Sequence, residues 1–576
     1  MRRVAVVGAG QAGLQLALGL LRAGHEVTVV SNRTAEEIAT GPVLSSQCMF
    51  GSALQTERAL GLDHWTDACP PVDGISLAVP DREGGRALNW AARLDAPARS
   101  VDQRLKIPGW LAEVERAGGE LVVHDAGIDD LELYARSHDL VVLATGKGAL
   151  GELFARDTEK SPYARPQRAL ALTYVTGMTP RAEYSAVCFN LIPEVGEYFV
   201  FPALTTTGPC EIMVFEGVPG GPLDCWDDVR TPVRHLERSL SLLEAYLPWE
   251  AERCRHVELT DRSGILTGRL TPTVRRPVGR LPSGTPVLGM ADAVVLNDPI
   301  TGQGSNNAAR CAELYLAGIL EHGDDPFTAE WMQTTFDRYW RGYAQWVVSW
   351  TNALLAPPKP HVLKLLSAAQ ELPGLAGTIV NGFDDPRAFY PWWFDADDAD
   401  RLIAEKRDQE QAGRFDSRDF RRALGQFATG VTVITTRTED GRRVGVTANS
   451  FSSASLEPPL VLWCLERTAP SRVAFDGCTH FGVNVLAADQ HHLSRQFSTP
   501  TEDKFAGVAT LEGPSGVPLL DGALAHFICR NVRQIELGDH VIVVGEVERY
   551  QTFEGEPLVF HSGFYRVATR HPDLDT

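Results

Sequence analysis

The chain has 576 residues, and its 54 Lys and Arg against 74 Asp and Glu give a formal net charge of −20 at pH 7. This length predicts two or more domains, and the acidic balance argues against binding to nucleic acid or to an anionic membrane. The ten cysteines form no C-x-x-C pair and no metal-ligand spacing, so we expect a cytoplasmic protein with reduced thiols and no bound metal. No segment approaches the roughly 20 apolar residues that span a bilayer, so no membrane role is expected.

The first stretch, residues 3–21, reads as a buried strand, a glycine turn and a helix in succession. Gly8, Gly10 and Gly13 form the turn. In a G-x-G-x-x-G turn the first glycine permits the bend, the second lets the backbone approach a pyrophosphate, and the third lets helix and strand pack closely. The pyrophosphate then binds free N–H groups of the helix. The stretch therefore predicts a site for FAD or NAD(P), with a glycine turn that holds no ligand as the alternative.

An acidic residue usually ends the second strand of a dinucleotide fold, where it binds the ribose hydroxyls. Here the strand 26–30 is followed by Ser31, Asn32 and Arg33. Asn32 can still bind a hydroxyl, whereas Arg33 would suit a 2′-phosphate and hence NADPH. This position alone leaves the choice of dinucleotide open.

The next segment, residues 34–100, is rich in Gly, Pro and Asp and is predicted to be irregular, with a surface loop at 40–47. Loops beside a cofactor fold often carry function. Residues 100–111 are expected to precede a helix that ends near residues 118–119, and two strands are predicted at 120–124 and 140–144.

Residues 170–265 alternate apolar and polar side chains, which predicts an antiparallel sheet inserted into the nucleotide fold. The buried-strand pattern returns at 287–293, and a glycine-rich turn at 298–307 leads into a helical region. Aromatic residues recur there at helical spacing, which is more typical of a core stripe than of a cofactor contact. They are Tyr339, Tyr343, Trp346 and Trp350.

The composition changes near residue 395. Residues 395–414 are highly charged and nearly free of large apolar side chains, which predicts a solvated helix or linker. Short β runs then follow from Phe415 onward, spaced as in a small β-barrel. We therefore predict an α/β fold. It has a Rossmann-like domain with an inserted antiparallel sheet and C-terminal helices over 1–394, a charged linker over 395–414 and a barrel over 415–576.

Five motifs follow one another in the first half. They are Gly8-Ala9-Gly10-x-Ala12-Gly13, Val101-Asp102-Gln103-Arg104-Leu105, Ala144-Thr145-Gly146-Lys147, Gly289-x-x-Asp292 and Asp298-Pro299-x-x-Gly302-Gln303-Gly304-x-Asn306. This set resembles the flavoprotein aromatic monooxygenases. Four further segments resemble the oxygenase component of the styrene monooxygenases, namely 96–102, 145–151, 161–163 and 166–170.

A second set of motifs lies between residues 415 and 568. They are Phe427-Ala428-Thr429-Gly430-Val431-Thr432-Val433, Thr447-Ala448-Asn449-Ser450-Phe451, Pro458-Pro459-Leu460, Val483-Asn484-Val485-Leu486, Gly538-Asp539-His540 and Gly563-Phe564-Tyr565. This set resembles the FMN-binding split-barrel flavin reductases. The resemblance implies a split β-barrel for the second half.

The first resemblance implies an FAD-binding fold of the aromatic hydroxylase type. Asp292, at the end of a buried strand, would bind the ribityl chain, with a helix cap as the alternative. The turn 299–306 would present backbone N–H groups and a positive helix dipole to the pyrimidine side of the ring, and Arg104 would lie near the pyrophosphate or the ring. The expected FAD contacts are Gly8, Gly10, Gly13, Asn32, Arg33, Arg104, Asp292, Pro299, Gly302, Gln303, Gly304 and Asn306.

Related single-component monooxygenases carry an A-D-G motif, used with NADPH and FAD, where this chain has Ala144-Thr145-Gly146. The missing Asp argues against direct use of NADPH by the first half. Reduced FAD must then be supplied, and the second half would supply it. The glycines of the first turn then hold FAD rather than NAD(P)H, and the absent acid at Ser31 and Asn32 implies a weaker grip on the adenosine end.

The second resemblance implies flavin reduction with NADH. Short hydroxyl and amide side chains suit flavin phosphate and ring edges, and Lys504 lies in a segment expected near the FAD adenylate. The expected flavin contacts are Thr447, Asn449, Ser450, Phe451, Ser452, Ser471, Asn484, Lys504 and Tyr565. His540 is the expected catalytic residue, on the nicotinamide side, with a surface turn histidine as the alternative. A homodimer through the second half is also implied.

The resemblances together imply a self-sufficient epoxidase. Reduced FAD would react with dioxygen to give a C4a-hydroperoxyflavin, which would epoxidise an aromatic alkene in a dry apolar pocket. The expected substrate contacts are Val43, Leu44, Ser46, Gln47 and Phe201. Styrene monooxygenases typically have Arg and Asn where this chain has Val43 and Ser46, so styrene and indole both remain open as substrates.

Two other functions are weighed. A stand-alone NADH:flavin oxidoreductase would need only the second half, with the first half as a flavin-storing module. A flavin-dependent halogenase would need a W-x-W-x-I-P signature, which this sequence lacks. The sequence leaves open whether NADH or NADPH is used and whether reduced FAD is transferred directly or by diffusion.

Overall fold

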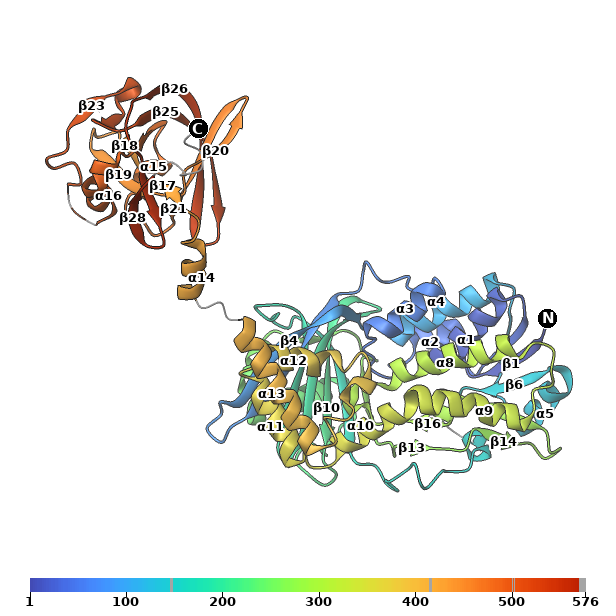
Figure 1. Ribbon diagram of the computed structural model, residues 1–576. Coiled ribbons are helices and arrows are strands. Elements are labelled where there is room, and N and C mark those ends of the chain that lie inside the picture. Colours follow the sequence, from blue (N-terminus) through green and yellow to red (C-terminus); the bar gives the residue numbers. More distant parts are fainter. Residues whose placement is uncertain (146–148, 414–416, 500, 502, 569–576) are drawn as a thin grey trace. The chain divides into compact units, whose positions relative to one another are not determined.

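The computed structural model describes residues 1–145, 149–413, 417–499, 501 and 503–568. The chain separates into two compact units, Met1–Ala412 and Gly413–Thr576 (Figure 1). Among the described residues, no helix combines the length and the apolar character needed to cross a membrane.

The core of the first unit is a six-stranded sheet in the order β14-β15-β6-β1-β2-β5. Its neighbouring strands are parallel except for β14 with β15. Four consecutive residues of β1 are buried, as expected for a parallel strand that is covered on both faces. This confirms the predicted Rossmann-like start. The strands are β1 (Arg3–Val7), β2 (Glu26–Ser31), β5 (Glu120–Val123), β6 (Leu140–Leu143), β14 (Val278–Arg280) and β15 (Pro286–Gly289).

A second, eight-stranded sheet has the order β11-β7-β10-β9-β8-β3-β4, with β12 paired to β7. Its pairs are antiparallel except for β3 with β8. The strands are β3 (Pro71–Pro80), β4 (Arg86–Arg99), β7 (Ala169–Thr176), β8 (Ala186–Ile192), β9 (Gly196–Thr205), β10 (Gly208–Gly217), β11 (Glu258–Leu259) and β12 (Ile265–Gly268). A small pair, β13 (Thr273–Val274) with β16 (Val295–Leu296), lies outside both sheets.

The prediction that residues 34–100 are irregular is wrong. They contain α2 (Ala35–Thr40), α3 (Gly51–Ala59) and the long β3–β4 hairpin. The register of that hairpin shifts between Val72 and Gly74 and again between Val79 and Pro80. Such bulges break the period-two alternation of side chains, so the strands gave no clear signal in the sequence.

Helices cover both sheets of the first unit. They are α1 (Gln11–Arg22), α4 (Gln103–Arg116), α5 (Ile128–Ser137), α6 (Pro232–Tyr246), α7 (Pro248–Arg253), α8 (Gly304–His322), α9 (Ala329–Tyr339), α10 (Gln345–Leu355), α11 (Pro360–Ala369), α12 (Pro373–Asn381) and α13 (Ala396–Gly413). One π-helical turn, η4 (Trp340–Ala344), joins α9 to α10, and four short 3-10 turns are η1 (Ala149–Leu153), η2 (Ala291–Ala293), η3 (Pro299–Thr301) and η5 (Pro386–Phe389).

The aromatic stripe after residue 338 belongs to the core, as predicted. Tyr339, Tyr343 and Trp350 are each at most 4% exposed. Trp350 stacks on Phe389, with ring centroids 4.2 Å apart. The stripe therefore stabilises the helical layer under the large sheet.

The segment 395–414, expected as a charged linker, is a helix over most of its length. Ala399 and Ile403 on α13 are buried in the hydrophobic cluster that also contains Trp350 and the inner face of the large sheet. The helix therefore packs on the first unit through a narrow apolar stripe, which its many charges concealed in the sequence.

The second unit is built on a seven-stranded antiparallel sheet in the order β19-β18-β22-β25-β26-β21-β20. Strands β19 and β21 also contact each other, so the sheet curls back as in a barrel. The β-rich prediction is confirmed, but the long strand β25 was missed. The elements are α14 (Ser417–Leu424), β17 (Thr429–Gly430), β18 (Thr432–Arg437), β19 (Arg443–Ala448), β20 (Ser452–Leu456), β21 (Pro459–Glu466), α15 (Arg472–Asp476), β22 (His480–Val485), η6 (Ala488–Gln490), α16 (His491–Ser498), β23 (Thr510–Glu512), η7 (Pro514–Gly516), β24 (Pro518–Leu520), β25 (Ala525–Leu537), β26 (His540–Thr552), β27 (Leu558–His561) and β28 (Phe564–Val567).

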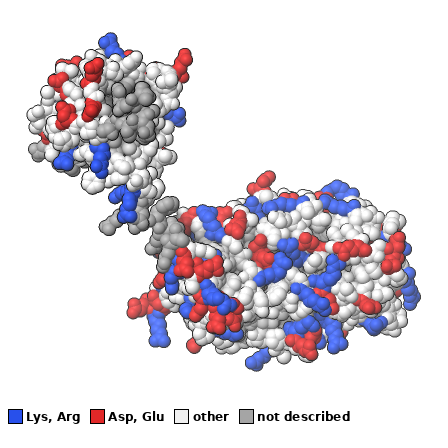
Figure 2. All heavy atoms as spheres, in the orientation of Figure 1, with Lys and Arg blue, Asp and Glu red and all other residues white. Residues whose placement is uncertain are grey.

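The surface charges of the first unit are mixed. On the face shown in Figure 2, Lys and Arg side chains are interspersed with Asp and Glu. On that face the basic residues form no broad patch of the kind that nucleic acid requires.

Candidate functional site

The glycine turn has the geometry that a dinucleotide needs. Gly8 has a φ of 122°, and a Cβ added to Gly13 would lie 2.0 Å from the carbonyl oxygen of Gly8. A side chain at either position would therefore disrupt the strand-to-helix turn. A Cβ added to Gly10 would meet no described atom within 4 Å. The turn is thus closed behind Gly8 and Gly13 and open at Gly10, where the backbone can approach a pyrophosphate.

Helices α1 and α8 begin at the same end of the nucleotide fold. They lie side by side (Figure 1). Gln15 and Ala312 line one cavity of about 330 Å³, and four residues further along both helices a Cβ on Gly19 would lie 2.3 Å from Cδ2 of Leu316. At the other end of the helices, the N–H of Arg2 donates to Nδ1 of His25, after α1, at 3.0 Å, and Nε of Arg2 donates to the carbonyl oxygen of Gly323, after α8, at 3.0 Å. Both helices therefore end beside the amino end of β1, so they run parallel.

Both helices start without a side-chain cap among the residues that the structure describes. The N-cap residue of α1 is Gly10, which has no side chain, and that of α8 is Gln303, whose side chain accepts no hydrogen bond from the first turn. Uncapped N–H groups and the positive end of the helix dipole attract anionic or electron-rich groups. Two such ends beside the open turn at Gly10 fit a flavin dinucleotide, with the diphosphate on α1 and the ring on α8.

The turn before α8 is held firmly by side chains. Asp298 accepts a hydrogen bond from the backbone N–H of Ile300 at 3.2 Å, and Gly302 then adopts a left-handed conformation with a φ of 64°. Nδ2 of Asn306 donates to the carbonyl oxygens of Gly302 and Cys48, at 3.0 and 2.8 Å. Pro299, Gly302 and Gly304 therefore occupy a rigid turn, and a flavin contact by the backbone of this turn stays a prediction.

Two more side chains of this turn are buried. Oδ1 of Asn306 accepts from the N–H of Phe50 at 2.9 Å, and Nε2 of Gln303 donates to the carbonyl oxygen of Phe383 at 2.7 Å. These bonds join α8 to the loop before α3 and to the segment after α12. The side chains of Gln303 and Asn306 thus position the turn, which leaves the backbone N–H groups for a ligand.

The residues predicted to contact the adenosine and the ribityl chain lie at the carboxyl ends of the parallel strands. Asn32 is exposed and Arg33 half-buried directly after β2. Ser31 uses its hydroxyl locally, donating to the carbonyl oxygen of Arg33 at 2.6 Å. Asp292 is exposed in η2, after β15. These residues and Gly8 share one edge of the sheet, which is where α/β folds bind nucleotides.

Arg104 lies in a buried ion-pair network. Its Nη2 atom is 2.7 Å from Oδ2 of Asp102 and 3.0 Å from Oδ2 of Asp261, and it donates to the hydroxyl of Thr205 at 3.0 Å. Only 3% of the Arg104 side chain is exposed. The guanidinium thus joins the start of α4 to the large sheet, and its contact with a flavin stays a prediction.

The loop 43–47 is fastened to the large sheet rather than free in solvent. The N–H of Val43 donates to the carbonyl oxygen of Ser263 at 3.0 Å, and Nε2 of Gln47 donates to the carbonyl oxygen of Val101. Both side chains are buried. The predicted surface loop is therefore partly buried, between the large sheet and the turn 298–306.

The large sheet presents aromatic side chains toward this loop. The Tyr174 hydroxyl donates to the carbonyl oxygen of Ser45 at 3.2 Å, and Phe201 is buried in the same hydrophobic cluster as Val43. Leu44 and Ser46 are half-buried. The structure thus brings Val43 and Phe201 into one apolar cluster, while the contact of all five predicted residues with a substrate stays a prediction.

One predicted position falls outside the described residues. Ala144 and Thr145 follow β6, where the N–H of Ala144 donates to the carbonyl oxygen of Val7 at 2.8 Å. Residues 146–148, which include the rest of the Ala144-Thr145-Gly146-Lys147 motif, are not described.

The sequence analysis missed two buried ion pairs of the first unit. Arg168 donates to Glu197 from Nε at 2.7 Å and from Nη2 at 2.8 Å, and Lys106 pairs with Glu57 at 2.6 Å. Arg168 stands in a motif that carried the family resemblance, but its partner gave no sequence signal. Only the strand pairing brings Glu197 to it.

In the second unit, three predicted flavin contacts lie around the loop between β19 and β20. The Thr447 hydroxyl donates to the carbonyl oxygen of Ser494 at 2.7 Å. The Ser450 hydroxyl accepts from the N–H of Cys464 at 2.9 Å, and Asn449 between them is exposed. These bonds fix the loop to α16 and β21 and leave Asn449 facing solvent.

The neighbouring predicted contacts differ in exposure. Phe451 lies against Phe527, with ring centroids 5.7 Å apart. Ser452 is exposed at the start of β20, and Ser471 is half-buried at the start of α15. Their flavin contacts stay predictions.

Lys504 and Tyr565 are both tied to α16. Nζ of Lys504 donates to the carbonyl oxygen of Phe497 at 2.7 Å, and burial lowers the pKa of Lys504. The Tyr565 hydroxyl is 2.8 Å from the hydroxyl of Ser494, which also receives the Thr447 bond at its carbonyl. The structure therefore brings Thr447, Lys504 and Tyr565 together around one helix.

Asn484 requires a correction. It is fully buried on β22, where Nδ2 donates to the carbonyl oxygen of Val433 at 2.9 Å and to the hydroxyl of Thr435 at 3.1 Å. Its Oδ1 accepts from the N–H of Leu520 at 2.8 Å. The amide is used inside the barrel and offers no surface to a ligand, so its role is structural rather than flavin binding.

His540 lies at the tip of the β25–β26 hairpin. Its Nδ1 is 2.8 Å from Oδ1 of Asp539, and 46% of its side chain is exposed. The strand register pairs it with Glu466 on β21, two residues beyond Cys464, which binds Ser450. The pairing places His540 at the same end of β21 as the loop between β19 and β20. Its action on nicotinamide stays a prediction.

The first unit matches known monooxygenases. A styrene monooxygenase from Pseudomonas fluorescens, StyA, is 31% identical over 387 residues, which is 64% of this chain and 91% of that protein. The chain belongs to the styrene monooxygenase family. The family model for a candidate substrate-binding domain of styrene monooxygenase A matches residues 146–253, which include four of the eight strands of the large sheet, β7 to β10.

The second unit matches flavin reductases. The family model "Flavin reductase like domain" covers residues 424–569. The FMN reductase (NADH) SmoA of Agrobacterium fabrum is 45% identical over 153 residues, which is 27% of this chain and 87% of that protein. A solved structure of the Streptomyces globisporus NADH:FAD oxidoreductase SgcE6, in complex with NAD and FAD fragments, is 40% identical. It covers 28% of this chain and 96% of that one, with a TM-score of 0.26.

A third family model, for F420-dependent NADP oxidoreductases, matches residues 3–41 alone. These residues are the first strand, the glycine turn and the second strand, which many dinucleotide folds share. The longer matches identify the chain as a two-function flavoprotein, in which a monooxygenase unit is fused to a flavin reductase unit.

Proposed function

We propose that this fused flavoprotein is a self-sufficient epoxidase. The reductase unit reduces FAD with NADH, and the monooxygenase unit uses reduced FAD and dioxygen to epoxidise a flat aromatic alkene, either styrene or indole. The observation that carries this proposal is the pair of parallel, uncapped helix ends beside the open turn at Gly10. That arrangement suits a flavin dinucleotide.

The choice of FAD over FMN follows from the first unit. FMN lacks the adenylate half for which a G-x-G-x-x-G turn and a second-strand ribose site are built. The related SmoA is named for FMN and NADH. We expect the reductase unit to accept both flavins and the monooxygenase unit to require FAD.

Bound flavin would supply hydride acceptance in one unit and dioxygen activation in the other. The residues of the monooxygenase unit bind and shield. The N–H groups at the start of α1 hold the diphosphate, and those at the start of α8 stabilise negative charge on the pyrimidine side of the ring. The apolar layer around Val43, Tyr174 and Phe201 excludes water and suits a substrate without charged groups.

Val43 and Ser46 bear on the choice of substrate. Neither side chain carries a charge, so a substrate in this layer is bound by packing and by the few polar groups nearby, such as the Tyr174 hydroxyl. A hydroxyl can bind the N–H of indole, which styrene lacks. We therefore expect indole to be a substrate alongside styrene.

In the reductase unit, Thr447, Asn449 and Ser450 bind the flavin at the loop before β20. His540, at the same end of β21, lies on the nicotinamide side. The motif Ala144-Thr145 lacks the Asp of related NADPH-using enzymes, so hydride enters through the reductase unit.

The experiment is aerobic turnover by the purified full chain with NADH, FAD and either styrene or indole, with ¹⁸O₂ as oxidant. The expected result is an epoxide, or a product derived from it, that carries one ¹⁸O atom. Hydrogen peroxide as the sole product would favour the alternative, an NADH:flavin oxidoreductase with a flavin-storing first unit. Product that appears only when a separate oxygenase is added would refute self-sufficiency.

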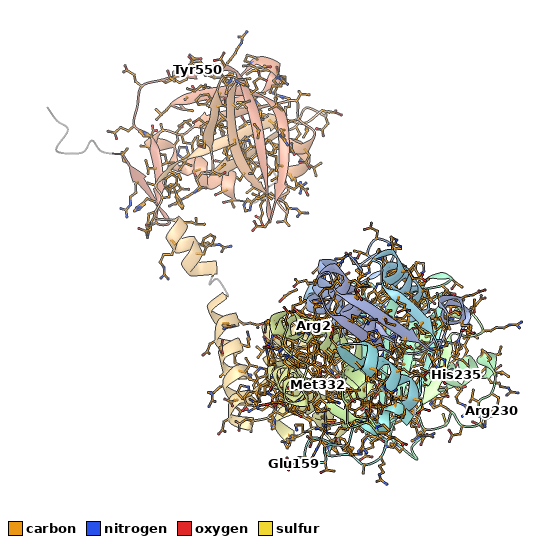
Figure 3. The ribbon with its side chains drawn as sticks, turned by 90° about the vertical axis from the view of Figure 1, so that its right-hand side faces the viewer. Arg2, Glu159, Arg230, His235, Met332 and Tyr550 are labelled. Atoms are coloured by element: carbon orange, nitrogen blue, oxygen red, sulfur yellow. The ribbon has the colours of Figure 1, made fainter. Side chains whose placement is uncertain are left out.

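We also propose that two chains associate through the reductase unit. Large apolar side chains are exposed on this unit, among them Tyr550 on β26, which is 73% exposed and is labelled in Figure 3. Leu456 and Phe564 are 91% and 64% exposed. Burial of such surface is the usual driving force of association. Size-exclusion chromatography of the full chain with light-scattering detection should give twice the monomer mass. A measured mass equal to that of one chain would contradict this proposal.

A further inference from the structure

Three buried carboxyl groups and one guanidinium meet where the large sheet contacts the turn 298–306. Glu197 on β9 and Glu216 on β10 are directly opposite each other in the strand register. Arg168 lies at the start of β7, and Asp298 begins the turn before α8. The exposed fractions of these side chains are all below a tenth, with Glu216 at 0% and Asp298 at 1%.

The charges in this cluster do not balance if all three carboxyl groups are ionised. Arg168 is engaged by Glu197 through two hydrogen bonds, and Arg168 is also the cation that acts on Glu216 and on Asp298. One guanidinium then faces three carboxyl groups. A buried carboxylate without a cation is strongly disfavoured, so a proton must neutralise part of the cluster.

The hydrogen-bond pattern indicates where that proton resides. Oδ1 of Asp298 accepts from the N–H of Ile300. No N–H or hydroxyl group of the described residues donates a hydrogen bond to either carboxyl oxygen of Glu216 or to Oδ2 of Asp298. The two carboxyl groups instead hydrogen-bond to each other. Such a bond requires one carboxyl group to be protonated, because an ionised carboxylate only accepts.

We propose that Glu216 carries a proton and donates it in a hydrogen bond to Asp298, and that this bond positions the turn which presents the start of α8 to the flavin. Burial, with the nearby charge of Asp298, raises the pKa of Glu216 well above its usual range, and burial raises the pKa of Asp298 less. The proton therefore resides on Glu216 in the coupled pair.

The shared proton joins two functional layers. Glu216 belongs to the sheet that carries Tyr174 and Phe201, and Asp298 belongs to the turn that precedes α8. Neither is placed on the flavin, so both act as positioning residues. Loss of the proton would set two negative charges against each other in the core and displace the turn.

The other groups that face this pair do not titrate in its place. Arg168 is always protonated near neutral pH. Burial raises the pKa of Glu197 as well, but its two hydrogen bonds from Arg168 oppose that shift and favour the ionised form. The Tyr163 hydroxyl donates to the carbonyl oxygen of Asn352 at 3.0 Å. Burial raises the pKa of Tyr163, so it stays neutral. A pH effect at the turn is thus assigned to Glu216 and Asp298.

The first test uses infrared spectra of the full chain without flavin at pH 7.5. The wild type should show the carbonyl stretch of a protonated carboxylic acid that is absent in Glu216→Gln. The matched control is Glu258→Gln, an exposed residue on β11 of the same sheet, which should retain the band. A wild type without this band, or a band that survives in Glu216→Gln, would overturn the proposal. No substrate is needed, so this result is independent of the proposed epoxidation.

The second test is FAD binding as a function of pH, followed by fluorescence. The dissociation constant of the wild type should rise about tenfold or more as the pH is raised and the proton is lost. Glu216→Gln keeps an N–H donor and has no proton to lose, so its dissociation constant should stay within about twofold over the same range. Flavin bound at the reductase unit contributes equally to both proteins. Parallel pH profiles would contradict the positioning role.

A third variant separates positioning from folding. Glu216→Leu removes the donor and should weaken FAD binding about tenfold at every pH. Its thermal unfolding is measured in parallel, because Asp298 then lacks a partner. If Glu216→Leu unfolds, the comparison of Glu216→Gln with the wild type still decides the proposal.

Discussion

Nζ of Lys106 lies 2.6 Å from Oε1 of Glu57, and only 2% and 3% of these side chains are exposed. Nε2 of Gln11, the residue after Gly10, donates to the same carboxylate at 2.9 Å. One buried carboxylate on α3 thus binds the first residue of α1 and the first turn of α4. The ion pair of Glu57 with Lys106 therefore fixes the position of Gln11, the residue that follows Gly10 of the glycine turn.

Lys106→Met should therefore destabilise the first unit strongly. It leaves the carboxylate of Glu57 buried without a cation, which typically costs about 3–5 kcal/mol. Urea unfolding of the full chain, followed by tryptophan fluorescence, measures the change. The control is Lys364→Met, which breaks an ion pair with Asp400 in which both side chains are more than half exposed and should change stability by about 0.5 kcal/mol or less. Equal effects of the two substitutions would be inconsistent with the buried pair.

Gly10→Ala and Gly13→Ala should separate binding from folding. The new methyl group at residue 13 would collide with the backbone of Gly8, so Gly13→Ala should lower the stability by about 1–3 kcal/mol. The methyl group at residue 10 meets no described atom within 4 Å, so Gly10→Ala should fold normally. It should weaken FAD binding about tenfold or more, because it occupies the space next to the pyrophosphate.

Unfolding midpoints and FAD titrations of both variants check this prediction. The control is Gly377→Ala, at a glycine of α12 outside the glycine motif, where an added Cβ would meet no described atom within 4 Å. It should leave FAD binding unchanged and alter the stability by about 1 kcal/mol or less. Tight FAD binding by Gly10→Ala would show that the diphosphate does not lie over this turn.

His235 should make the first unit less stable in mild acid. It is buried on α6, its ring stacks on Trp226 with centroids 4.7 Å apart, and Nδ1 is 2.9 Å from the Thr173 hydroxyl (Figure 3 labels His235). Burial lowers its pKa from 6.5 to about 4. Because the folded pKa lies below the unfolded value, the stabilising contribution is present above pH 6.5 and is lost as the pH falls toward 4.

The full loss amounts to roughly 3 kcal/mol over that interval. Unfolding midpoints between pH 7.5 and 5 should fall more steeply in the wild type than in His235→Gln, which cannot be protonated. His64→Gln, at a side chain that is 38% exposed, should follow the wild type. Identical slopes in all three proteins would exclude the burial effect.

His540→Ala should separate the two activities of the chain. We expect kcat/KM for NADH-dependent flavin reduction to fall by about tenfold, which corresponds to about 1.4 kcal/mol of lost transition-state stabilisation. Oxygenation that is driven by FAD reduced chemically beforehand should be unchanged, because the first unit is intact. Stopped-flow absorbance measures the first step and product analysis the second.

The matched substitution for this experiment is His561→Ala, at a half-buried histidine on β27. Flavin reduction should remain normal in this variant. A loss of chemically driven oxygenation in His540→Ala would mean that the histidine also serves the monooxygenase unit.

Local patterns predicted the nucleotide fold because its signals are short in range. The run 4–7, the glycine turn and the following leucines lie within one segment, and each needs only its neighbours to be recognised. The strands 120–124 and 140–144 were found for the same reason. The run 287–293 predicted β15, but the strand ends at Gly289 and residues 291–293 form the turn η2. The β3–β4 hairpin was missed because bulges shift its register, and the apolar stripe of α13 was concealed among charges.

The candidate site divides in the same way. Gly8, Gly10, Gly13 and the turn 298–306 were identified from the spacing of residues along the chain, since backbone geometry depends on local sequence. Their support was not identified. Glu57 with Lys106, and Arg168 with Glu197, are joined across long separations by helix packing and strand register.

The sequence by itself determined that the chain combines a dinucleotide-binding monooxygenase unit with a flavin reductase unit, because those motifs are continuous segments. Only the tertiary structure decided that Asn484 is structural, that Arg104 lies between two aspartates, and that Glu216 meets Asp298. A charged or polar side chain in a sequence has no assigned partner. Its protonation and its role are set by burial and by the groups that folding brings within hydrogen-bond distance.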